Sequence, residues 1–153
     1  AGLWFDGQRH LPAQLDGPGA WPTDDNHPVL RAAALQLGQY LAGTRQAFDL
    51  PLDLSGGTPF QQAVWRALLA LPRGGTTSYG ALAHQIGRPA AVRAVGAAVG
   101  RNPISIIVPC HRVLGSGGAL TGYAGGLPRK VELLRLEGAQ PTHANPCHLP
   151  AYA

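Results

Sequence analysis

Residues 106–113 read Ile-Ile-Val-Pro-Cys-His-Arg-Val, and the rest of the chain is best understood from this stretch. An apolar run leads into Pro109, whose ring fixes one backbone angle and removes an N–H donor. Cys110, His111 and Arg112 follow directly. A thiol is a nucleophile only as the thiolate; a neighbouring imidazole can accept its proton, and positive charge lowers its pKa. An inert buried cysteine beside a surface His–Arg pair is the alternative, but the contiguity favours a reactive thiol.

The composition indicates a globular protein. The chain has 153 residues, of which 45% are hydrophobic and 13% charged, which suits one domain or one domain with a small lobe. No run of about 18 uncharged apolar residues is present, so we expect no membrane span, and the first residues do not resemble a signal peptide. Two cysteines do not make a disulfide framework, so a reducing, cytoplasmic location is expected.

Charge is divided unevenly along the chain. Residues 1–56 contain three Arg and six Asp, whereas residues 57–138 contain nine Arg or Lys and two Glu. The basic segment is the one that holds Cys110. An Arg-rich segment suits a polyanion such as nucleic acid, although a solvated basic face explains the charge alone about equally well.

The first 56 residues are expected to form a small lobe. Residues 2–5 suit a short strand, and residues 28–42 have the apolar spacing of an amphipathic helix. Residues 47–54 alternate apolar and polar in part, and their proline restricts them to an edge strand. Residues 6–27 are rich in turn formers and suit a loop. A strand that opens the chain without a partner strand before it suggests an N-terminally shortened lobe.

A clear helix start follows the Ser-Gly-Gly sequence at residues 55–57, which suits a hinge between the two segments. Thr58 is a predicted N-cap, Pro59 suits the first helical position, and Gln61 completes a capping box. The apolar residues expected to face the core of this helix are Phe60, Val64, Trp65, Leu68 and Leu69.

Two further short helices form a predicted helix-turn-helix. Ser78 caps the first, at about residues 79–86, and the second spans about residues 89–99. The second contains almost only Ala, Val and Gly, with Arg93 as its one long charged residue. Small side chains let a helix approach a partner closely, so we favour DNA over a core helix with Arg93 at its rim.

The remaining segments suggest a pocket wall, a last helix and a tail. Residues 121–126 form a glycine-rich loop that lacks the spacing of a phosphate-binding loop, so a substrate-pocket wall is expected. A helix is predicted over residues 127–136, with Leu127, Val131, Leu133 and Leu134 inward. Residues 139–153 suit a flexible tail. Three of its side chains are weak metal-ligand candidates: His143, Cys147 and His148.

These motifs together resemble one protein family, the O6-alkylguanine-DNA alkyltransferases. The matching segments are Thr77-Ser78-Tyr79-Gly80, Arg93-Ala94-Val95-Gly96, Asn102-Pro103, Pro109-Cys110-His111-Arg112-Val113, Gly122-Tyr123-Ala124-Gly125-Gly126-Leu127 and Glu137-Gly138. The resemblance is specific over residues 57–138 and loose over residues 1–56. It implies an α+β fold: a small ribonuclease-H-like N-terminal lobe, here apparently partial, and a helical C-terminal domain with the helix-turn-helix and active site.

The resemblance also implies catalytic roles. Cys110 would accept the alkyl group, His111 would act as its base through a water, and Glu137 would orient His111. Asn102 would brace the turn that aligns the active-site strand. Tyr79 would press on the phosphate next to the flipped nucleotide, and its hydroxyl is a candidate proton donor to the departing guanine.

Contacts to DNA and to the base are implied in the same way. Arg93 would fill the space left by the flipped base. The other residues expected at the DNA are Tyr79, Ala91, Gly96 and Ser78. The residues expected to border the guanine are Val108, Pro109, Val113, Tyr123 and Ala124. Arg112 is expected to anchor the domain.

The expected partner is duplex DNA containing O6-alkylguanine, and the expected reaction is an irreversible, stoichiometric transfer by a monomer. No cofactor and no metal are expected, because the zinc site of some relatives needs N-terminal cysteines and residues 1–56 contain none. Ser105 stands where some relatives have a proline that rests on bulky adducts, so the acceptance of large alkyl groups is an open question. Activity on O4-alkylthymine is likewise open.

Other functions were weighed against this one. A non-catalytic sensor of alkylated DNA is the main alternative, but such proteins replace the residue at Cys110. A transcription factor needs polar side chains for base edges, and residues 89–99 offer only Arg93. A Cys–His hydrolase needs an oxyanion site, which the sequence does not reveal. The sequence also leaves open that this domain is fused to a methyl-responsive regulator domain.

Overall fold

The computed structural model describes residues 1–15 and 17–139, which form five α-helices and two short strands. In chain order these are α1 (Pro28–Leu41), α2 (Pro59–Leu69), β1 (Thr77–Ser78), α3 (Tyr79–Gln85), α4 (Val92–Gly100), β2 (Val113–Leu114) and α5 (Leu127–Leu136). Three 3-10 turns, η1 (Ala13–Leu15), η2 (Cys110–Arg112) and η3 (Ser116–Gly118), complete the set. The predicted tail, with His143, Cys147 and His148, lies outside the described residues apart from residue 139.

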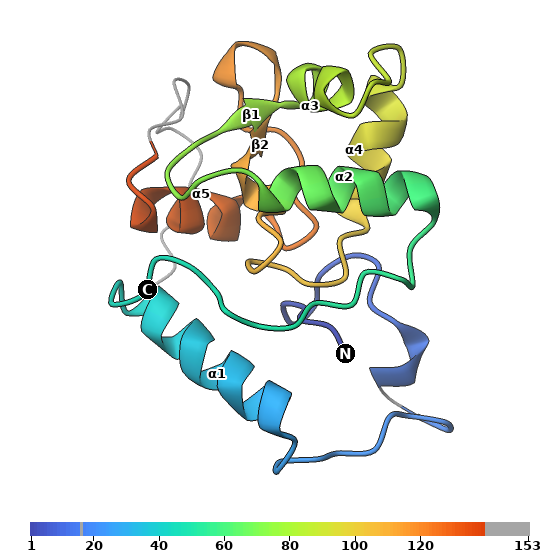
Figure 1. Cartoon of the computed structure of the whole chain (residues 1–153), viewed down its shortest axis with the longest axis vertical. Helices are drawn as coiled ribbons and strands as arrows, with labels where there is room; N and C mark the ends of the chain where they lie inside the picture. The colour runs from blue at the N-terminus through green and yellow to red at the C-terminus, as the bar shows by residue number, and fades with distance from the viewer. Residues whose placement is uncertain (16, 140–153) are drawn as a thin grey trace.

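The two strands are parallel, with Thr77 opposite Val113 and Ser78 opposite Leu114. This pairing joins the segment before α3 to the segment that follows Cys110. In Figure 1, α1 lies at one side of the molecule, and the segment between α1 and α2 runs between this helix and the remainder. The mixture of helices with a small sheet agrees with the predicted α+β class.

Several helix starts are confirmed, because local side-chain chemistry fixes them. Thr58 Oγ1 accepts from the N–H of Gln61 at 3.2 Å, and Gln61 Oε1 accepts from the N–H of Thr58 at 2.9 Å. Pro59 occupies the first turn of α2. Ser78 Oγ caps α3 by accepting from the N–H of Ala81 at 3.1 Å. Capping satisfies donors that the first turn of a helix leaves unpaired.

The prediction of a helix from residue 89 was wrong by three residues, because α4 begins at Val92. The N–H of Ala91 donates to the carbonyl of Arg88 at 2.9 Å, so residues 88–91 form a turn instead. Two residues predicted to face the core are also exposed: Leu69 of α2 and Leu127 of α5.

The two strands predicted in the N-terminal segment do not form. At residues 2–5 there is a single parallel bridge, between Leu3 and Ile104. Within the described residues no neighbouring strand pairs with residues 47–54, which are irregular, and the side-chain amide of Gln36 bonds to their backbone at Asp49. Its Nε2 donates to the carbonyl of Asp49 at 2.9 Å, and its Oε1 accepts from the N–H of Asp49 at 2.8 Å.

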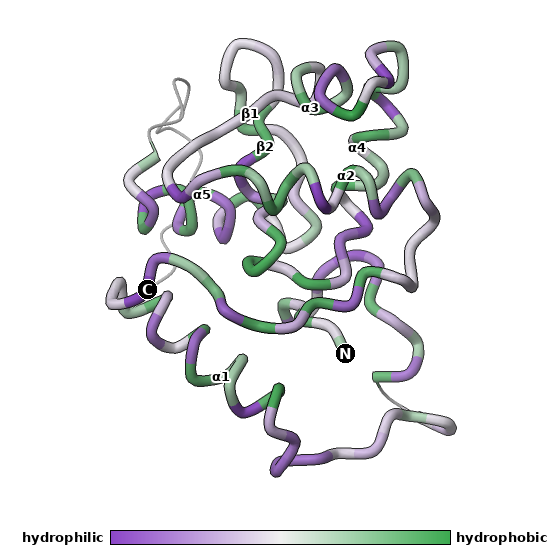
Figure 2. The backbone as a smooth tube through the Cα atoms, viewed as in Figure 1, coloured by the Kyte–Doolittle hydropathy of each residue, from purple (hydrophilic) through white to green (hydrophobic). Residues whose placement is uncertain are grey.

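The main core lies between α2, α3, α4 and the chain that leads to Cys110. Trp65 of α2 is buried and its indole N–H donates to the carbonyl of Ala98 in α4 at 2.9 Å. Figure 2 shows the hydrophobic segment around residues 104–108 passing close to α2. This packing holds α4 and the Cys110 segment in a fixed relation, which positions the site.

Candidate active site

The backbone before Cys110 turns sharply twice and is not a strand, which corrects the prediction of an active-site strand. Ile106 has φ 70°, a left-handed conformation that is uncommon for a β-branched residue. Pro109 has φ −82° and ψ 64°, and the N–H of Cys110 donates to the carbonyl of Val108 at 2.8 Å. These values describe an inverse γ-turn, a shape that the proline ring favours. The turn delivers Cys110 to the start of η2.

Asn102 connects the thiol to the end of α4. Its Nδ2 donates to the carbonyl of Val108 at 2.8 Å and lies 3.1 Å from Cys110 Sγ, while its Oδ1 accepts from the N–H of Ile104 at 2.9 Å. Burial raises the pKa of the Cys110 thiol, and the Asn102 amide acts in the opposite direction. Cys110 therefore rests as a thiol, and its reaction requires a base.

His111 has the geometry of that base. It is fully buried, and its Nε2 lies 2.7 Å from Glu137 Oε1. Burial lowers the pKa of His111, so the ring is neutral, and its proton belongs on Nε2 because Glu137 is an acceptor. Nδ1 then carries a lone pair and makes no hydrogen bond to the described residues. A neutral imidazole in this state can accept a proton.

Glu137 receives hydrogen bonds from more than the predicted histidine. Arg112 donates to it through Nε at 2.8 Å and through a terminal nitrogen at 2.9 Å. The hydroxyl of Tyr40, from α1, donates to Oε1. Burial alone would raise the pKa of Glu137, but the hydrogen bonds from His111 and Arg112 outweigh it and hold the pKa well below its usual range. Glu137 is therefore ionised.

Gly74 brings the backbone of the loop after α2 against this carboxylate. Its N–H lies 3.4 Å from Glu137 Oε2, and its φ is 76°. A Cβ at Gly74 would lie 2.9 Å from the carbonyl oxygen of Glu137. Arg112 also donates to the carbonyl of Leu71 at 2.6 Å, which agrees with its predicted role as an anchor.

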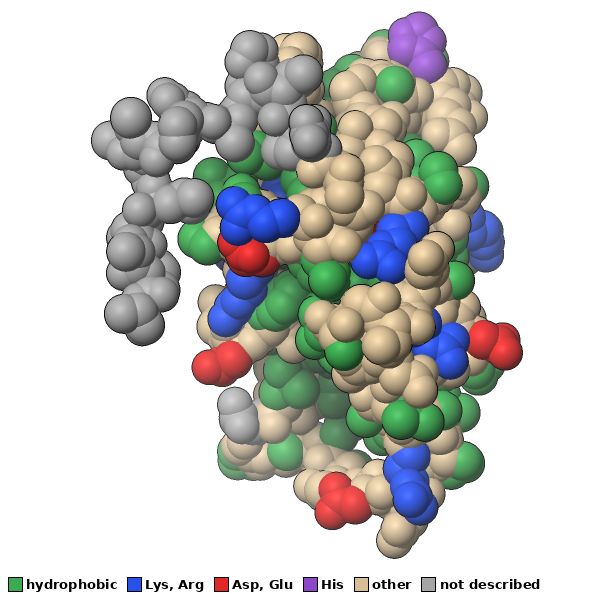
Figure 3. Space-filling model, turned by 90° about the vertical axis from the view of Figure 1, so that its left-hand side faces the viewer, with side chains coloured by type: hydrophobic (Ala, Val, Ile, Leu, Met, Phe, Trp, Pro, Cys, Tyr) green, Lys and Arg blue, Asp and Glu red, His purple; other side chains and the backbone are tan. Residues whose placement is uncertain are grey.

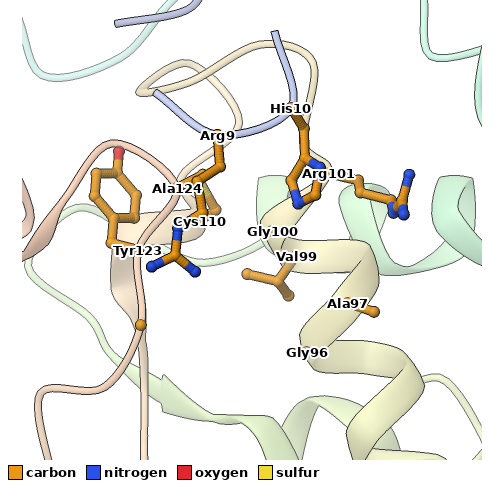
Figure 4. A pocket seen from close by; sticks show the side chains of 11 residues that line it. Arg9, His10, Gly96, Ala97, Val99, Gly100, Arg101, Cys110, Tyr123 and Ala124 are labelled. Carbon is orange, nitrogen blue, oxygen red and sulfur yellow. The ribbon is translucent and has the colours of Figure 1, made fainter. Parts of the chain in front are cut away.

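A cavity of about 270 Å³ contains Cys110 on its wall. It lies between the C-terminal half of α4, the loop at residues 122–124 and the loop at residues 9–10. Figure 4 shows Tyr123 on one side of this space and Val99 of α4 on the other. Three of the α4 residues that line the cavity have a small side chain or none: Gly96, Ala97 and Gly100.

The predicted pocket residues are divided between this cavity and the protein behind it. Four predicted site residues line the cavity: Cys110, Gly96, Tyr123 and Ala124. Three others are buried and do not line it: Val108, Pro109 and Val113. Burial raises the pKa of Tyr123, and the neighbouring Cys110 raises it further.

The residues predicted to meet DNA lie on α3 and α4 or directly before them. Arg93 is exposed and Ala91 is half-buried at the start of α4. Tyr79 begins α3, and a Cβ at Gly96 would lie 3.8 Å from its ring. Ser78 serves as the cap of α3.

Lys130 supports the loop that forms the pocket wall. Its ammonium donates to the carbonyls of Val113 at 2.6 Å and Thr121 at 2.8 Å, and lies 3.4 Å from that of Gly122. Its side chain is fully buried, and this burial lowers its pKa to about 8. The sequence alone does not single out this residue, because a lysine on a helix usually faces solvent.

Tyr40 was missed for a related reason. Its place in α1 fits the apolar helical spacing, so the sequence predicts a core residue and reveals nothing about the hydroxyl. Arg9 and His10 line the cavity, but they fall within residues 6–27, whose turn-forming composition predicts only a loop.

Within residues 1–15 and 17–139 there is no cluster of three potential metal ligands among His, Cys, Asp and Glu. In the same part of the chain, no helix is both long and apolar enough to cross a membrane. Figure 3 shows one face of the molecule, on which Lys and Arg side chains are scattered among hydrophobic and neutral ones. The basic excess does not form one continuous patch on this face.

These features define a class of protein: one with a buried cysteine, a neighbouring buried His–Glu pair, and a small-residue helix beside the thiol. Comparisons with known proteins give the family. Residues 59–139 match the family model described as the 6-O-methylguanine DNA methyltransferase, DNA binding domain. The chain belongs to the 6-O-methylguanine DNA methyltransferase family.

The similar proteins include bacterial and archaeal relatives. A methylated-DNA–protein-cysteine methyltransferase of Mycobacterium tuberculosis is 62% identical over 117 residues, covering 76% of this chain and 69% of that protein. The crystal structure of M. tuberculosis OGT in complex with DNA has a TM-score of 0.68 at 60% identity, covering 70% and 66%. That of the Pyrococcus kodakaraensis O6-methylguanine-DNA methyltransferase has a TM-score of 0.57 at 32% identity, covering 78% and 66%. The chain thus spans about two thirds of their length.

We expect the acid stability of the protein to depend on Glu137. The unfolded carboxyl titrates near 4.5, whereas in the folded protein it stays ionised to lower pH. The stabilisation is therefore fully present above 4.5 and is lost as the pH falls toward the folded pKa. Urea unfolding at several pH values should show the free energy of unfolding falling more steeply between about pH 5 and 3 in the wild type than in Glu137→Gln. Glu132→Gln, an exposed change on α5, should retain the wild-type slope; equal slopes in all three proteins would contradict this expectation.

We expect the Tyr40 hydroxyl to stabilise the fold through Glu137. Tyr40→Phe keeps the ring that packs against Phe48 and removes only the donor, which should lower the free energy of unfolding by about 1–3 kcal/mol. A double-mutant cycle with Glu137→Gln, measured by urea unfolding, tests the pairing. The effect of Tyr40→Phe should shrink when Glu137 is replaced, and strictly additive effects would show that the hydroxyl acts elsewhere.

Proposed function

We propose that the protein repairs DNA by transferring the alkyl group of O6-alkylguanine in duplex DNA to Cys110 Sγ. The observation that carries this proposal is the union of Cys110, Asn102, His111 and Glu137 beside a cavity that α4 borders. The methyltransferase relatives and the DNA complex of the M. tuberculosis protein support it.

The chemistry is a displacement at the alkyl carbon. The Cys110 proton passes to Nδ1 of His111, with a water as the carrier, and the developing charge on the ring is stabilised by Glu137. The thiolate forms the S–C bond as the C–O6 bond breaks, and the guanine that leaves takes up one proton. We assign Tyr79 as the donor of that proton. The thiol proton held by His111 then passes through water to the Tyr79 phenolate, so both side chains end neutral.

The reaction occurs once per molecule. A thioether is a stable product, and the residues around Cys110 offer a base but no reagent that would remove an alkyl group. The protein is therefore a stoichiometric acceptor that needs no cofactor. Methyl is the assigned group; O4-alkylthymine presents the same kind of carbon and is a second substrate to test.

We propose that α3 and α4 act as the helix-turn-helix and that the target base leaves the duplex. A thiol that is 4% exposed is out of reach of a stacked base, so the nucleotide must rotate into the cavity. Arg93 is exposed on α4 and has the length to fill the vacated space. Ala91, Gly96 and Ser78 are small enough for a close approach to the backbone, and Tyr79 lies beside Gly96.

The finer organisation is proposed in the same sense. Residues 1–56 correspond to a ribonuclease-H-like lobe, residues 57–138 to the DNA-binding and active-site domain, and residues 139–153 to a tail. Val108, Pro109 and Val113 support the guanine pocket from behind, and Tyr123 and Ala124 border it. The protein acts as a monomer in the cytoplasm.

A non-catalytic sensor of alkylated DNA is the alternative function. It would need the cavity and α4 but no reactive thiol. The presence of Cys110 with an ionised Glu137 and a neutral His111 favours transfer.

Intact-mass spectrometry tests the transfer. After incubation with duplex DNA containing O6-methylguanine, the wild type should gain the mass of one methyl group on the peptide that contains Cys110. Cys110→Ala should gain nothing, and Cys147→Ala, the matched cysteine control, should gain the same mass as the wild type. Binding of the duplex without any mass gain would instead identify a sensor.

Arg93→Ala tests base flipping. It should slow transfer from duplex DNA by about tenfold or more, equivalent to about 1.4 kcal/mol, and leave transfer from the free base O6-methylguanine nearly unchanged. Arg135→Ala, at an exposed position of α5, provides the charge control. Equal losses on duplex and free base would remove Arg93 from this role.

A further inference from the structure

The loop at residues 8–10 brings an arginine from the N-terminal segment to the cavity that contains Cys110. Arg9 and His10 both line this cavity, although they come from the opposite end of the sequence. Figure 4 shows the Arg9 side chain directed from its loop into the space between Tyr123 and Val99. Arg9 lies outside the residues that match the family model.

The loop is tied to the active-site domain at several points. Gln8 is buried, and its Oε1 accepts from the N–H of Phe5 at 2.7 Å and from Ser105 Oγ at 3.2 Å. The N–H of Arg9 donates to the carbonyl of Ala124 at 3.1 Å, in the pocket wall itself. These hydrogen bonds hold the loop, and with it Arg9, beside the cavity.

The loop also contains a backbone outlier. His10 has φ 60°, in the left-handed region. Such conformations cost energy in residues other than glycine and are concentrated at functional sites. The bend at His10 lies directly after Arg9, and both residues line the cavity.

The N–H donors of the Arg9 guanidinium are free to bind a ligand. It makes no side-chain hydrogen bond to the described residues, whereas Arg45, Arg73, Arg112 and Arg129 all donate to carbonyls or side chains. Arg101 and His10 also line the cavity, and no Asp or Glu does. A planar guanidinium in these surroundings suits a bidentate contact to a carboxylate or a phosphate.

We propose that Arg9 is a further substrate-binding residue, whose guanidinium binds an oxyanion carried by the lesion nucleotide. This inference rests on the proposed alkyl transfer. The oxyanion has two sources with the same chemistry: a backbone phosphate of the flipped nucleotide, or the carboxylate of an anionic adduct such as O6-carboxymethylguanine. In either case the N-terminal segment takes part in choosing the substrate.

The test compares Arg9→Gln with Arg31→Gln, which removes the same charge from an exposed position on α1. Transfer rates to Cys110 are measured by mass spectrometry with three substrates: free O6-methylguanine, duplex O6-methylguanine and duplex O6-carboxymethylguanine. Arg9→Gln should lower the rate with at least one duplex by about tenfold, as expected for the loss of a hydrogen-bonded charge. Its rate with the uncharged free base should stay within about twofold of the wild type.

The pattern of rate losses across the substrates identifies which oxyanion Arg9 binds. A loss shared by both duplexes assigns the phosphate, whereas a loss confined to the carboxymethyl duplex assigns the adduct. Arg9→Lys, which keeps the charge but not the planar fork, should recover part of the rate.

Two results would overturn the inference: rates equal to those of Arg31→Gln on every substrate, or an equal loss on the free base, which would indicate a damaged site. A wild type that transfers nothing would instead overturn the proposed function.

Discussion

The buried carboxylate of Glu137 is the point on which the active site depends. It joins α1 through Tyr40, the loop after α2 through Gly74, and the Cys110 turn through His111 and Arg112. A buried charge is costly unless its lone pairs are satisfied, so these segments cannot separate without leaving the carboxylate unpaired. The same contacts keep Glu137 ionised, which fixes the tautomer of His111. Stability and chemistry are thus controlled by one side chain.

In the proposed reaction, Cys110 remains a neutral thiol until a substrate arrives. Burial favours the neutral thiol of Cys110, and the Asn102 amide reduces that preference without reversing it. The lone pair on His111 Nδ1 can accept the proton of the Cys110 thiol. Because burial disfavours the thiolate, this transfer becomes favourable only when an electrophilic carbon is present to react with the sulfur. For a protein that reacts once, this arrangement guards against loss of the thiol to other electrophiles. The two turns at Ile106 and Pro109 fix its direction.

Local chemistry explains which parts could be predicted from sequence. The starts of α2 and α3 follow from the caps Thr58 and Ser78, whose bonding partners are within three residues. Cys110 and His111 stand together in the sequence, and Glu137 is associated with them only by resemblance to a family. Contacts over long separations were not predicted: Tyr40 with Glu137, and Gln36 with the segment at residues 47–54. No periodic pattern signals such contacts, because each one depends on how whole elements pack.

Lys130 is the single lysine of the sequence and is fully enclosed beneath the loop at residues 121–123. Amine-directed reagents will therefore find no lysine to label on the folded chain. A lysine label will appear only when that loop opens, so the modification becomes a reporter of the closed pocket wall. Opening also removes the burial that lowers the pKa of this amine to about 8, so the exposed lysine calls for an alkaline labelling buffer. Surface immobilisation through lysine would in turn select molecules whose pocket has already come apart.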